Sequence, residues 1–153
     1  MEVGYRMDHP LLNVMPFVAM QATSLQMNSF KESNTDNLGL SVAGNTTMSE
    51  PGSLGIQLDR AFEFNEKWSM YPLIRMSWVH EFQTSRSINA SLQALPTANW
   101  TVNGASAAPN SANVGISFQA MNKNGLAFFA SGDVDASSTT QSYMGQVGFK
   151  LLW

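Results

Sequence analysis

The sequence lacks cysteine altogether and carries few charges of either sign. The absence of cysteine from its 153 residues excludes disulfide bonds and thiol chemistry. Charged residues make up 12% of the chain, about half of the roughly 25% found in an ordinary soluble domain. The net charge of −3 argues against nucleic acid as a partner, because phosphate binding needs clustered lysine and arginine. With only two histidines, His9 and His80, a histidine-rich zinc site is not expected either.

Long hydrophobic runs are also missing. No stretch approaches the roughly 18 apolar residues that a transmembrane helix needs, and the longest candidates, such as residues 125–130, have the length of a strand. The N-terminus has neither the basic region nor the apolar core of a signal peptide. Because Val3 already lies in an alternating pattern, we interpret residues 1–153 as one domain, truncated at its N-terminus, of a longer precursor.

Hydrophobic and polar residues alternate over most of the chain, with the period of a β-strand rather than of a helix. The pattern predicts an all-β protein with about eight strands and no helix of usable length. The expected strands cover residues 3–7, 12–27, 38–42, 54–64, 68–82, 114–120, 126–135 and 143–153.

The connections between these strands differ in length. Asn65-Glu66-Lys67 and Asn122-Lys123-Asn124-Gly125 have the composition of tight turns, whereas Gln83–Ala112, rich in Ser, Asn, Ala and Pro, predicts a long loop. Short turns at one rim and long loops at the other are typical of antiparallel up-and-down barrels of the bacterial outer membrane. If the C-terminus is periplasmic and successive strands cross the membrane in opposite directions, Gln83–Ala112 and Ser137–Thr140 lie at the outer rim. The same count places Ser29–Asp36 at the periplasmic rim, with the tight turns.

Alternation alone does not say which face is wet, because a soluble β-sandwich also buries one face of each strand. Here the polar phase is small and mostly uncharged, which is typical of a lumen rather than of a solvated surface. The ions of the polar phase are predicted to face this lumen: Asp59, Glu63, Arg75, Glu81, Asp133 and Lys150.

Aromatic residues on the apolar phase fall near strand ends, where interfacial girdles lie in membrane barrels. They are Phe62, Phe64, Trp68, Trp78, Phe82, Phe149 and Trp153. One cation, Arg60, shares the apolar phase, and we expect its side chain to reach the headgroups. These features favour a transmembrane β-barrel whose apolar face meets outer-membrane lipid.

The chain ends on a free Trp within an amphipathic strand. An edge strand of this kind must pair with something, and a closed barrel is one common solution. The apolar phase of this last strand consists of Tyr143, Val147, Phe149, Leu151 and Trp153.

Several of these segments, taken in their order, resemble the translocator (β) domain of type V secretion autotransporters. The most specific is the P-x-x-R-x-x-W-x-H-E-F stretch of residues 72–82, followed by a long loop. The others are Tyr5-Arg6, Pro16-Phe17, Phe30-Lys31-Glu32-Ser33, Leu38-Gly39-Leu40-Ser41-Val42, Ser53-Leu54-Gly55-Ile56-Gln57-Leu58 and Val147-Gly148-Phe149-Lys150-Leu151-Leu152-Trp153.

The resemblance implies the C-terminal part of a twelve-stranded barrel, integral to the bacterial outer membrane, that helps export an N-terminal passenger. It implies that the apolar phase of the last strand, Tyr143 to Trp153, is an insertion signal read by the barrel-assembly machinery, with periplasmic chaperones as earlier partners. It implies no cofactor and no enzymatic activity for this segment.

Candidate chemical sites are few. In His80-Glu81, the two side chains fall on opposite phases of a strand, so acid–base catalysis or metal binding is not favoured. Asp133 and Asp135 share a phase and could hold calcium with loop carbonyls, but pairing with Arg75 or Lys150 is the preferred interpretation. No nucleophile elbow, Walker loop or dinucleotide-binding motif is present.

The sequence leaves three alternatives to the translocator open. One is a complete eight-stranded barrel acting as an adhesin or porin-like structural protein, which would bind through Gln83–Ala112. Another is an outer-membrane hydrolase, which lacks a defensible Ser–His pair. The last is a soluble β-sandwich or a lipocalin-like carrier.

Overall fold

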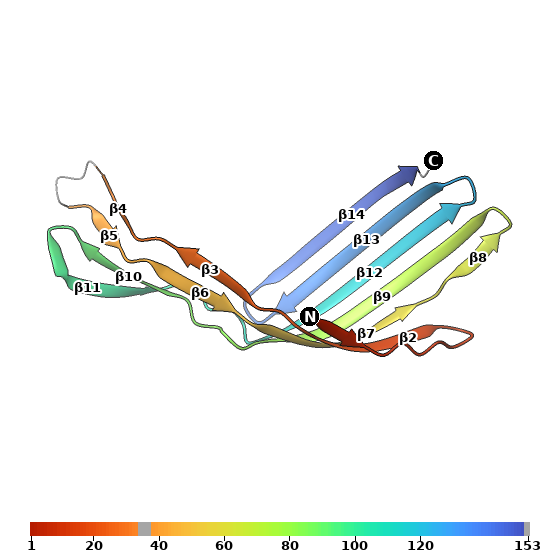
Figure 1. Cartoon of the computed structure of the whole chain (residues 1–153), viewed down its shortest axis with the longest axis horizontal. Coiled ribbons are helices and arrows are strands. Elements are labelled where there is room, and N and C mark those ends of the chain that lie inside the picture. The colour runs from red at the N-terminus through yellow and green to blue at the C-terminus, as the bar shows by residue number, and fades with distance from the viewer. Residues whose placement is uncertain (34–37, 152–153) are drawn as a thin grey trace. The chain divides into compact units, whose positions relative to one another are not determined.

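The computed structural model describes residues 1–33 and 38–151, and within them the chain is built from antiparallel β-strands (Figure 1). No helix in this part of the chain is long and apolar enough to span a membrane. The chain divides into two compact units. The first comprises Met1–Met20, Gly52–His80 and the residues from Asn110 onward. The second comprises Gln21–Pro51 and Glu81–Pro109, and we call its described residues the loop unit.

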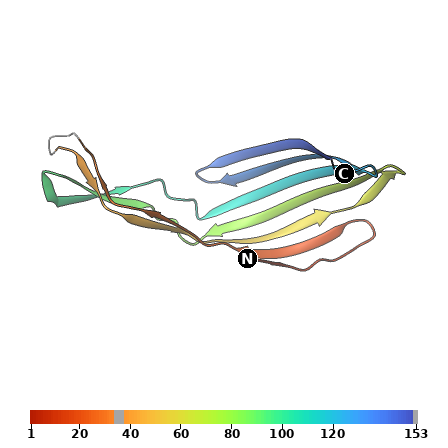
Figure 2. The ribbon, with the colours of Figure 1, turned by 45° about the horizontal axis from the view of Figure 1, so that its top comes forward.

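The first unit is an eight-stranded sheet, called the main sheet below, in which the strands run in the order β1-β2-β7-β9-β12-β13-β14 and β8 pairs with β9 (Figures 1 and 2). Within the described residues the sheet is open, with β1 at one edge and β14 at the other. Its strands are β1 (Glu2–Gly4), β2 (Asn13–Met20), β7 (Pro51–Asp59), β8 (Phe62–Asn65), β9 (Trp68–Glu81), β12 (Asn110–Asn122), β13 (Leu126–Ser137) and β14 (Gln141–Leu151).

The loop unit contains two smaller sheets. One is the pair β3 (Thr23–Met27) and β6 (Asn45–Ser49), and the other has the order β11-β10-β5-β4. The strands of the second are β4 (Phe30–Lys31), β5 (Leu40–Val42), β10 (Ser87–Leu92) and β11 (Leu95–Asn103). Because β5 and β10 pair, the connection after β2 and the connection after β9 fold together into one structured body.

The expected all-β, antiparallel fold is confirmed, and so are the two tight turns. The Asn65 side-chain oxygen accepts hydrogen bonds from the backbone N–H groups of Lys67 and Trp68, at 2.9 and 3.0 Å. The Asn122 side-chain oxygen accepts in the same way from the backbone N–H groups of Asn124 and Leu126. Gly125 has a backbone φ of 84°, a value that residues with a side chain rarely adopt.

Two expectations about the first 60 residues are wrong. Residues 38–42 were expected in the barrel, but β5 belongs to the loop unit, and β8 brings the main sheet to eight strands. As a result, Ser29–Ser33 lie in a connection that starts from the same end of the main sheet as 82–109, not from the end with the tight turns. The expected range Ser29–Asp36 continues into residues outside the described part.

Other strand bounds also differ from expectation. The expected strand 12–27 divides into β2 and β3, and the expected long loop Gln83–Ala112 contains β10, β11 and the start of β12. The expected strand 54–64 breaks at Arg60-Ala61, so Arg60 is an exposed residue between β7 and β8 rather than part of a strand's apolar phase.

Candidate functional site

The two faces of the main sheet differ sharply in chemistry, and the strand register assigns each residue to one of them. Residues that pair directly across strands share a face. Ile74, Ile116 and Gly132 form one such row, and Arg75, Gly115 and Asp133 form the next. We call the first face the apolar face and the second the polar face. On both faces side chains remain exposed: the buried hydrophobic residues described in the main sheet are only Phe17 and Ala127.

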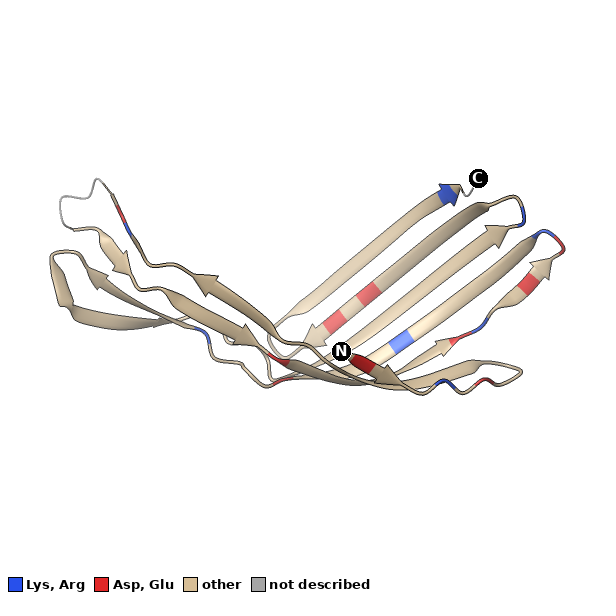
Figure 3. Ribbon diagram, viewed as in Figure 1, with Lys and Arg blue, Asp and Glu red and all other residues tan. Residues whose placement is uncertain are grey.

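Across six strands the apolar face holds few polar side chains, and these, such as His80, Asn110 and Asn122, lie at strand ends. It carries Val14, Pro16, Val18, Leu54, Ile56, Leu58, Trp68, Met70, Pro72, Ile74, Met76, Trp78, Val114, Ile116, Phe118, Phe128, Val134, Tyr143, Val147 and Phe149. Its aromatics lie toward the strand ends, as the sequence predicts: Trp68 stacks on Phe128 with ring centroids 6.1 Å apart, and Trp78 lies 5.7 Å from His80. The charges of the main sheet are sparse (Figure 3).

A continuous chain of polar contacts crosses the polar face from β1 to β9. The Arg75 guanidinium donates to a carboxylate oxygen of Glu2 and, at 3.3 Å, to the side-chain oxygen of Gln57. The same guanidinium lies 3.7 Å over the ring of Phe17, a cation–π contact. Phe17 is only 3% exposed, which makes it the most buried hydrophobic residue of the sheet.

The chain of contacts continues through Gln57 to Asp59. The Gln57 amide donates to Asp59 at 3.2 Å, and Asp59 also accepts from Asn13 at 3.1 Å. Arg6, in the segment between β1 and β2, donates to both carboxylate oxygens of Asp59, at 2.7 and 3.1 Å, and to Asp8 at 2.9 Å. The bidentate pair fixes the end of β7 against the β1–β2 turn.

Sequence analysis singled out Arg75 and Asp59 but not the residues that join them. Glu2, Arg6 and Gln57 fall on the polar phase of the alternating sequence pattern, and that phase was the available signal. The sequence indicated the position of Phe17 less clearly. Phe17 follows Pro16, which is on the apolar phase, so Phe17 falls on the polar phase although it is an apolar residue. The alternating pattern thus predicts the face on which the network lies, but it does not predict which ions pair with one another.

The remaining ions of the polar phase do not join this network. Glu63, Asp133 and Lys150 pair across strands with Ser69, Gly115 and Ala127, which puts them on the same face as Arg75. Asp135 accepts a hydrogen bond from Asn113 at 3.0 Å. Within residues 1–33 and 38–151, Arg75 forms its ion pair with Glu2, so the expected pairing of Asp133 with Arg75 or Lys150 is not found. That this face lines a lumen stays a prediction.

His80 and Glu81 lie in different surroundings. The His80 ring nitrogen Nδ1 is 2.9 Å from the side-chain oxygen of Asn110. Glu81 belongs to the loop unit, where its carboxylate accepts hydrogen bonds from the Ser49 hydroxyl and from the backbone N–H groups of Glu50 and Gln83. No group of three or more metal-ligating residues occurs in the described part of the chain.

Glu81 holds together the two chain segments of the loop unit. Its burial acts to raise the pKa, but the hydrogen bonds from Ser49, Glu50 and Gln83, with the nearby charge of Arg86, outweigh burial and hold the pKa of Glu81 below its ordinary value. Arg86 adds hydrogen bonds to the carbonyl oxygens of Met48 and Gln83, at 3.1 and 2.7 Å. One ionised carboxylate therefore joins residues 49–50 to residue 83.

Acid should loosen this junction. Because the pKa of Glu81 is lowered by folding, its contribution to stability is present above the unfolded glutamate value of about 4.3 and is lost as the pH falls through and below it. Hydrogen exchange, corrected for the intrinsic pH dependence, should show reduced protection at the Glu50 and Gln83 amides on acidification, while β12–β13 stays protected. Glu81→Gln should lower protection at neutral pH and remove most of the pH dependence. Unchanged pH dependence in that variant would contradict the assignment.

The predicted insertion-signal residues lie along one face of the edge strand β14. Tyr143, Val147, Phe149 and Leu151 are all exposed, with Val147 at 84%. They continue the apolar face of β13 through the register pairs Val134↔Tyr143 and Phe128↔Phe149. Trp153 lies outside the described residues. Recognition of this strand by assembly machinery stays a prediction.

Comparison with protein families identifies the family to which this fold belongs. A model of the autotransporter β-domain matches residues 1–133, which is most of the chain and includes the Arg75–Gln57–Asp59 network; β14 lies beyond the match. No curated protein matches the chain. The family expected from the order of the sequence motifs is confirmed: this chain belongs to the autotransporter β-domain family, whose members are outer-membrane translocator domains.

Proposed function

We propose that this chain is the C-terminal portion of the translocator barrel of a longer precursor, and that it helps export an N-terminal passenger to the cell surface. The observation that carries the proposal is the register of the main sheet, which gives one face a continuous set of large apolar side chains and puts every strand ion on the other face. In a bilayer, an apolar outer band and a polar inner face are what a spanning barrel requires.

The polar face suits the passage of an unfolded chain. Its uncharged polar residues, such as Ser117, Gln119 and Ser131, keep a lumen hydrated without offering a fixed charge pattern that would select a particular passenger. The ions that do occur near β1, β2, β7 and β9 are paired with one another, so they stiffen the wall and leave little net charge there. In this proposal the segment breaks no bond, and any catalytic activity would belong to the passenger.

The open edges give the chain its place in the barrel. Among the described residues β1 and β14 each present an unpaired edge, which lipid does not tolerate. We infer that the strands which close the barrel are supplied by the part of the precursor that precedes Met1. The bacterial outer membrane is the proposed location, and the barrel-assembly machinery and periplasmic chaperones are the proposed partners in insertion.

The export role can be tested with the precursor that carries this chain. An epitope placed in the precursor ahead of its barrel should become accessible to antibody on intact cells. Deleting residues 141–153, which removes β14, should leave the epitope accessible only after lysis, because β13 then loses its partner and the barrel cannot close. If the undeleted precursor folds in the outer membrane, as judged by heat-modifiable gel migration, yet its epitope is detected only in lysed cells, the export role is wrong.

A further inference from the structure

The four-stranded sheet of the loop unit has a polar face whose residues the translocator role does not use. One rung of this sheet aligns Asn99, Ser91, Ser41 and Lys31, each paired directly with the next across β11, β10, β5 and β4. The side chains of a rung share a face, and three interstrand spacings give the row a length of about 14 Å. The opposite face is apolar and carries Trp100, Ala90, Val42 and Phe30.

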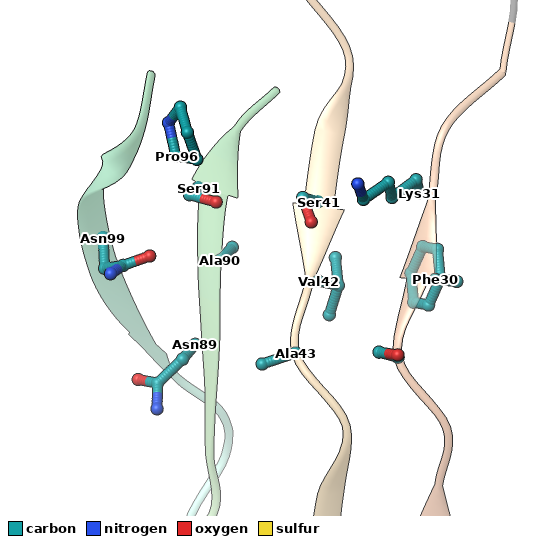
Figure 4. A pocket seen from close by; sticks show the side chains of 11 residues that line it. Phe30, Lys31, Ser41, Val42, Ala43, Asn89, Ala90, Ser91, Pro96 and Asn99 are labelled. Carbon is teal, nitrogen blue, oxygen red and sulfur yellow. The ribbon is translucent and has the colours of Figure 1, made fainter. Parts of the chain in front are cut away.

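A hollow of about 530 Å³ lies along this rung (Figure 4). Its volume falls within the roughly 300–1,000 Å³ range of small-molecule sites. The ammonium group of Lys31 extends toward Ser41, and the Ser91 hydroxyl is directed toward β5. Pro96 adds an apolar surface at one end. The hollow is therefore a trough with hydroxyl and amide groups along the rung and a cation near one end, and Phe30, Val42, Ala43 and Ala90 also contribute to its lining.

The polar groups of this row have no partner within the described part of the chain. The side chains of Lys31, Ser41, Ser91 and Asn99 form no hydrogen bond or ion pair there. Ser91 is 8% exposed as a residue, but no buried side-chain oxygen or nitrogen of the described residues lacks a partner, so its unbonded hydroxyl is accessible from the trough. These accessible donors and acceptors are free to bond to water or to a ligand. By contrast, Asn89 on the neighbouring rung is held by the Thr101 hydroxyl at 2.8 Å.

We propose that this trough, the residues Lys31, Ser41, Ser91 and Asn99 with Pro96, binds an acidic oligosaccharide. Hydroxyl and amide groups both donate and accept hydrogen bonds, as sugar hydroxyls do, so the row matches a neutral stretch of sugar. The Lys31 ammonium then pairs with a carboxylate or other anionic substituent near one end. Pro96 offers the apolar surface that the C–H face of a sugar ring contacts.

Other classes of ligand fit the trough less well. Lys31 is the one charged residue among those lining it, whereas nucleic acid needs several cations along its backbone. An apolar ligand would leave four polar groups unpaired, at a cost for each. Binding at this surface needs no transport of a passenger, so the inference stands apart from the translocator role.

The test uses the precursor that carries this chain, purified from outer membranes in detergent, and measures binding by calorimetry. The acidic probes are 3′-sialyllactose and trigalacturonate, and lactose is the neutral counterpart of the first. At least one acidic probe should bind with a Kd on the order of 1 mM or tighter, with lactose about tenfold weaker. Ser91→Ala and Asn99→Ala should each weaken binding of the acidic probe about three- to tenfold. Lys31→Gln should abolish the preference for the acidic probe over lactose.

The matched control is Lys123→Gln, which removes one positive charge from a tight turn of the main sheet and should change no Kd. Heat-modifiable gel migration establishes that each variant is folded. The proposal is overturned if neither acidic probe binds the folded wild-type precursor. It is also overturned if the Lys31, Ser91 and Asn99 variants bind as the wild type does, or if equimolar acetate displaces the sugar, which would reveal a site for simple anions.

Discussion

Replacing Gly55 by alanine should destabilise the main sheet more than the same change at any other glycine considered below. A Cβ at residue 55 would lie 2.5 Å from the backbone oxygen of Met76 and 2.7 Å from Cε1 of Phe17. Contacts that short do not occur, so either the β7–β9 spacing or the Phe17 ring must move. The ring can move only by giving up its buried site under Arg75, and the Met76 oxygen is fixed by the ladder.

We expect Gly55→Ala to cost about 1–3 kcal/mol of unfolding free energy, the usual range for overpacking a close contact. The measurement is the urea midpoint of the precursor's barrel in detergent, followed by heat-modifiable gel migration. An intermediate effect is expected from Gly148→Ala, where the close atoms all belong to the Phe129 ring, the nearest 2.5 Å away. A ring can rotate aside, but a backbone carbonyl in a ladder cannot.

Gly132→Ala is the control for this series. Its added Cβ would meet its nearest neighbours, the Met144 oxygen and Ile116 Cγ1, at 3.7 and 3.9 Å, which are ordinary contacts. Because alanine also loses less backbone entropy than glycine on folding, this variant should be neutral or slightly stabilising. If Gly55→Ala has an unfolding midpoint as high as that of Gly132→Ala, then Phe17 does not pack into the notch left by Gly55.

This notch shows where sequence reasoning stops. Alternation assigns Gly55 and Phe17 to a common phase, and Pro16 and Val18 to the other, without alignment or structure. It does not reveal that Phe17 faces Gly55 directly, because that depends on the register of β2 against β7. Residues 21–50, not a tight turn, join β2 to β7, so no local sequence signature sets this register.

The loop unit illustrates a different limit. Leu38, Leu40 and Val42 alternate as well as any strand of the main sheet, so the pattern predicts a barrel strand there. The period identifies a strand but not its partners, and β5 pairs with β10 from a segment about 50 residues later in the chain. Ser, Asn and Ala between 83 and 112 suggested an irregular loop. The β10–β11 hairpin forms there because Ile88, Ala90, Trp100 and Val102 share one face.

The polar trough of the loop unit could not be predicted from the sequence for the same reason. Lys31, Ser41, Ser91 and Asn99 come from four segments, and only the pairing of β4, β5, β10 and β11 puts them in one row. The two faces of the main sheet could be predicted, because the alternation of side chains along a strand is a local property of the sequence. The strongest sequence inference is therefore the assignment of faces, and it admits the most direct test.

Replacing Ile116 by lysine should greatly reduce the amount of folded protein in the outer membrane. Ile116 is the middle residue of β12, lies on the apolar face and is 57% exposed. If that face meets lipid, a lysine there lies near the bilayer midplane and costs about 2–4 kcal/mol. Ser117 is the next residue and lies on the polar face, so Ser117→Lys should leave folding nearly unchanged.

Depth supplies the second arm of the experiment. Ala112 is on the same strand and the same face as Ile116, but only two residues from the start of β12. Ala112→Lys should cost about 0–1 kcal/mol, because its ammonium can reach the headgroups. The measurements are the folded fraction in isolated outer membranes and the urea midpoint in lipid vesicles. A soluble sandwich with the apolar face inside would instead penalise lysine according to burial, without a gradient toward the strand end. Equal effects at Ile116 and Ser117, or no gradient from Ile116 to Ala112, would therefore contradict a lipid-facing apolar surface.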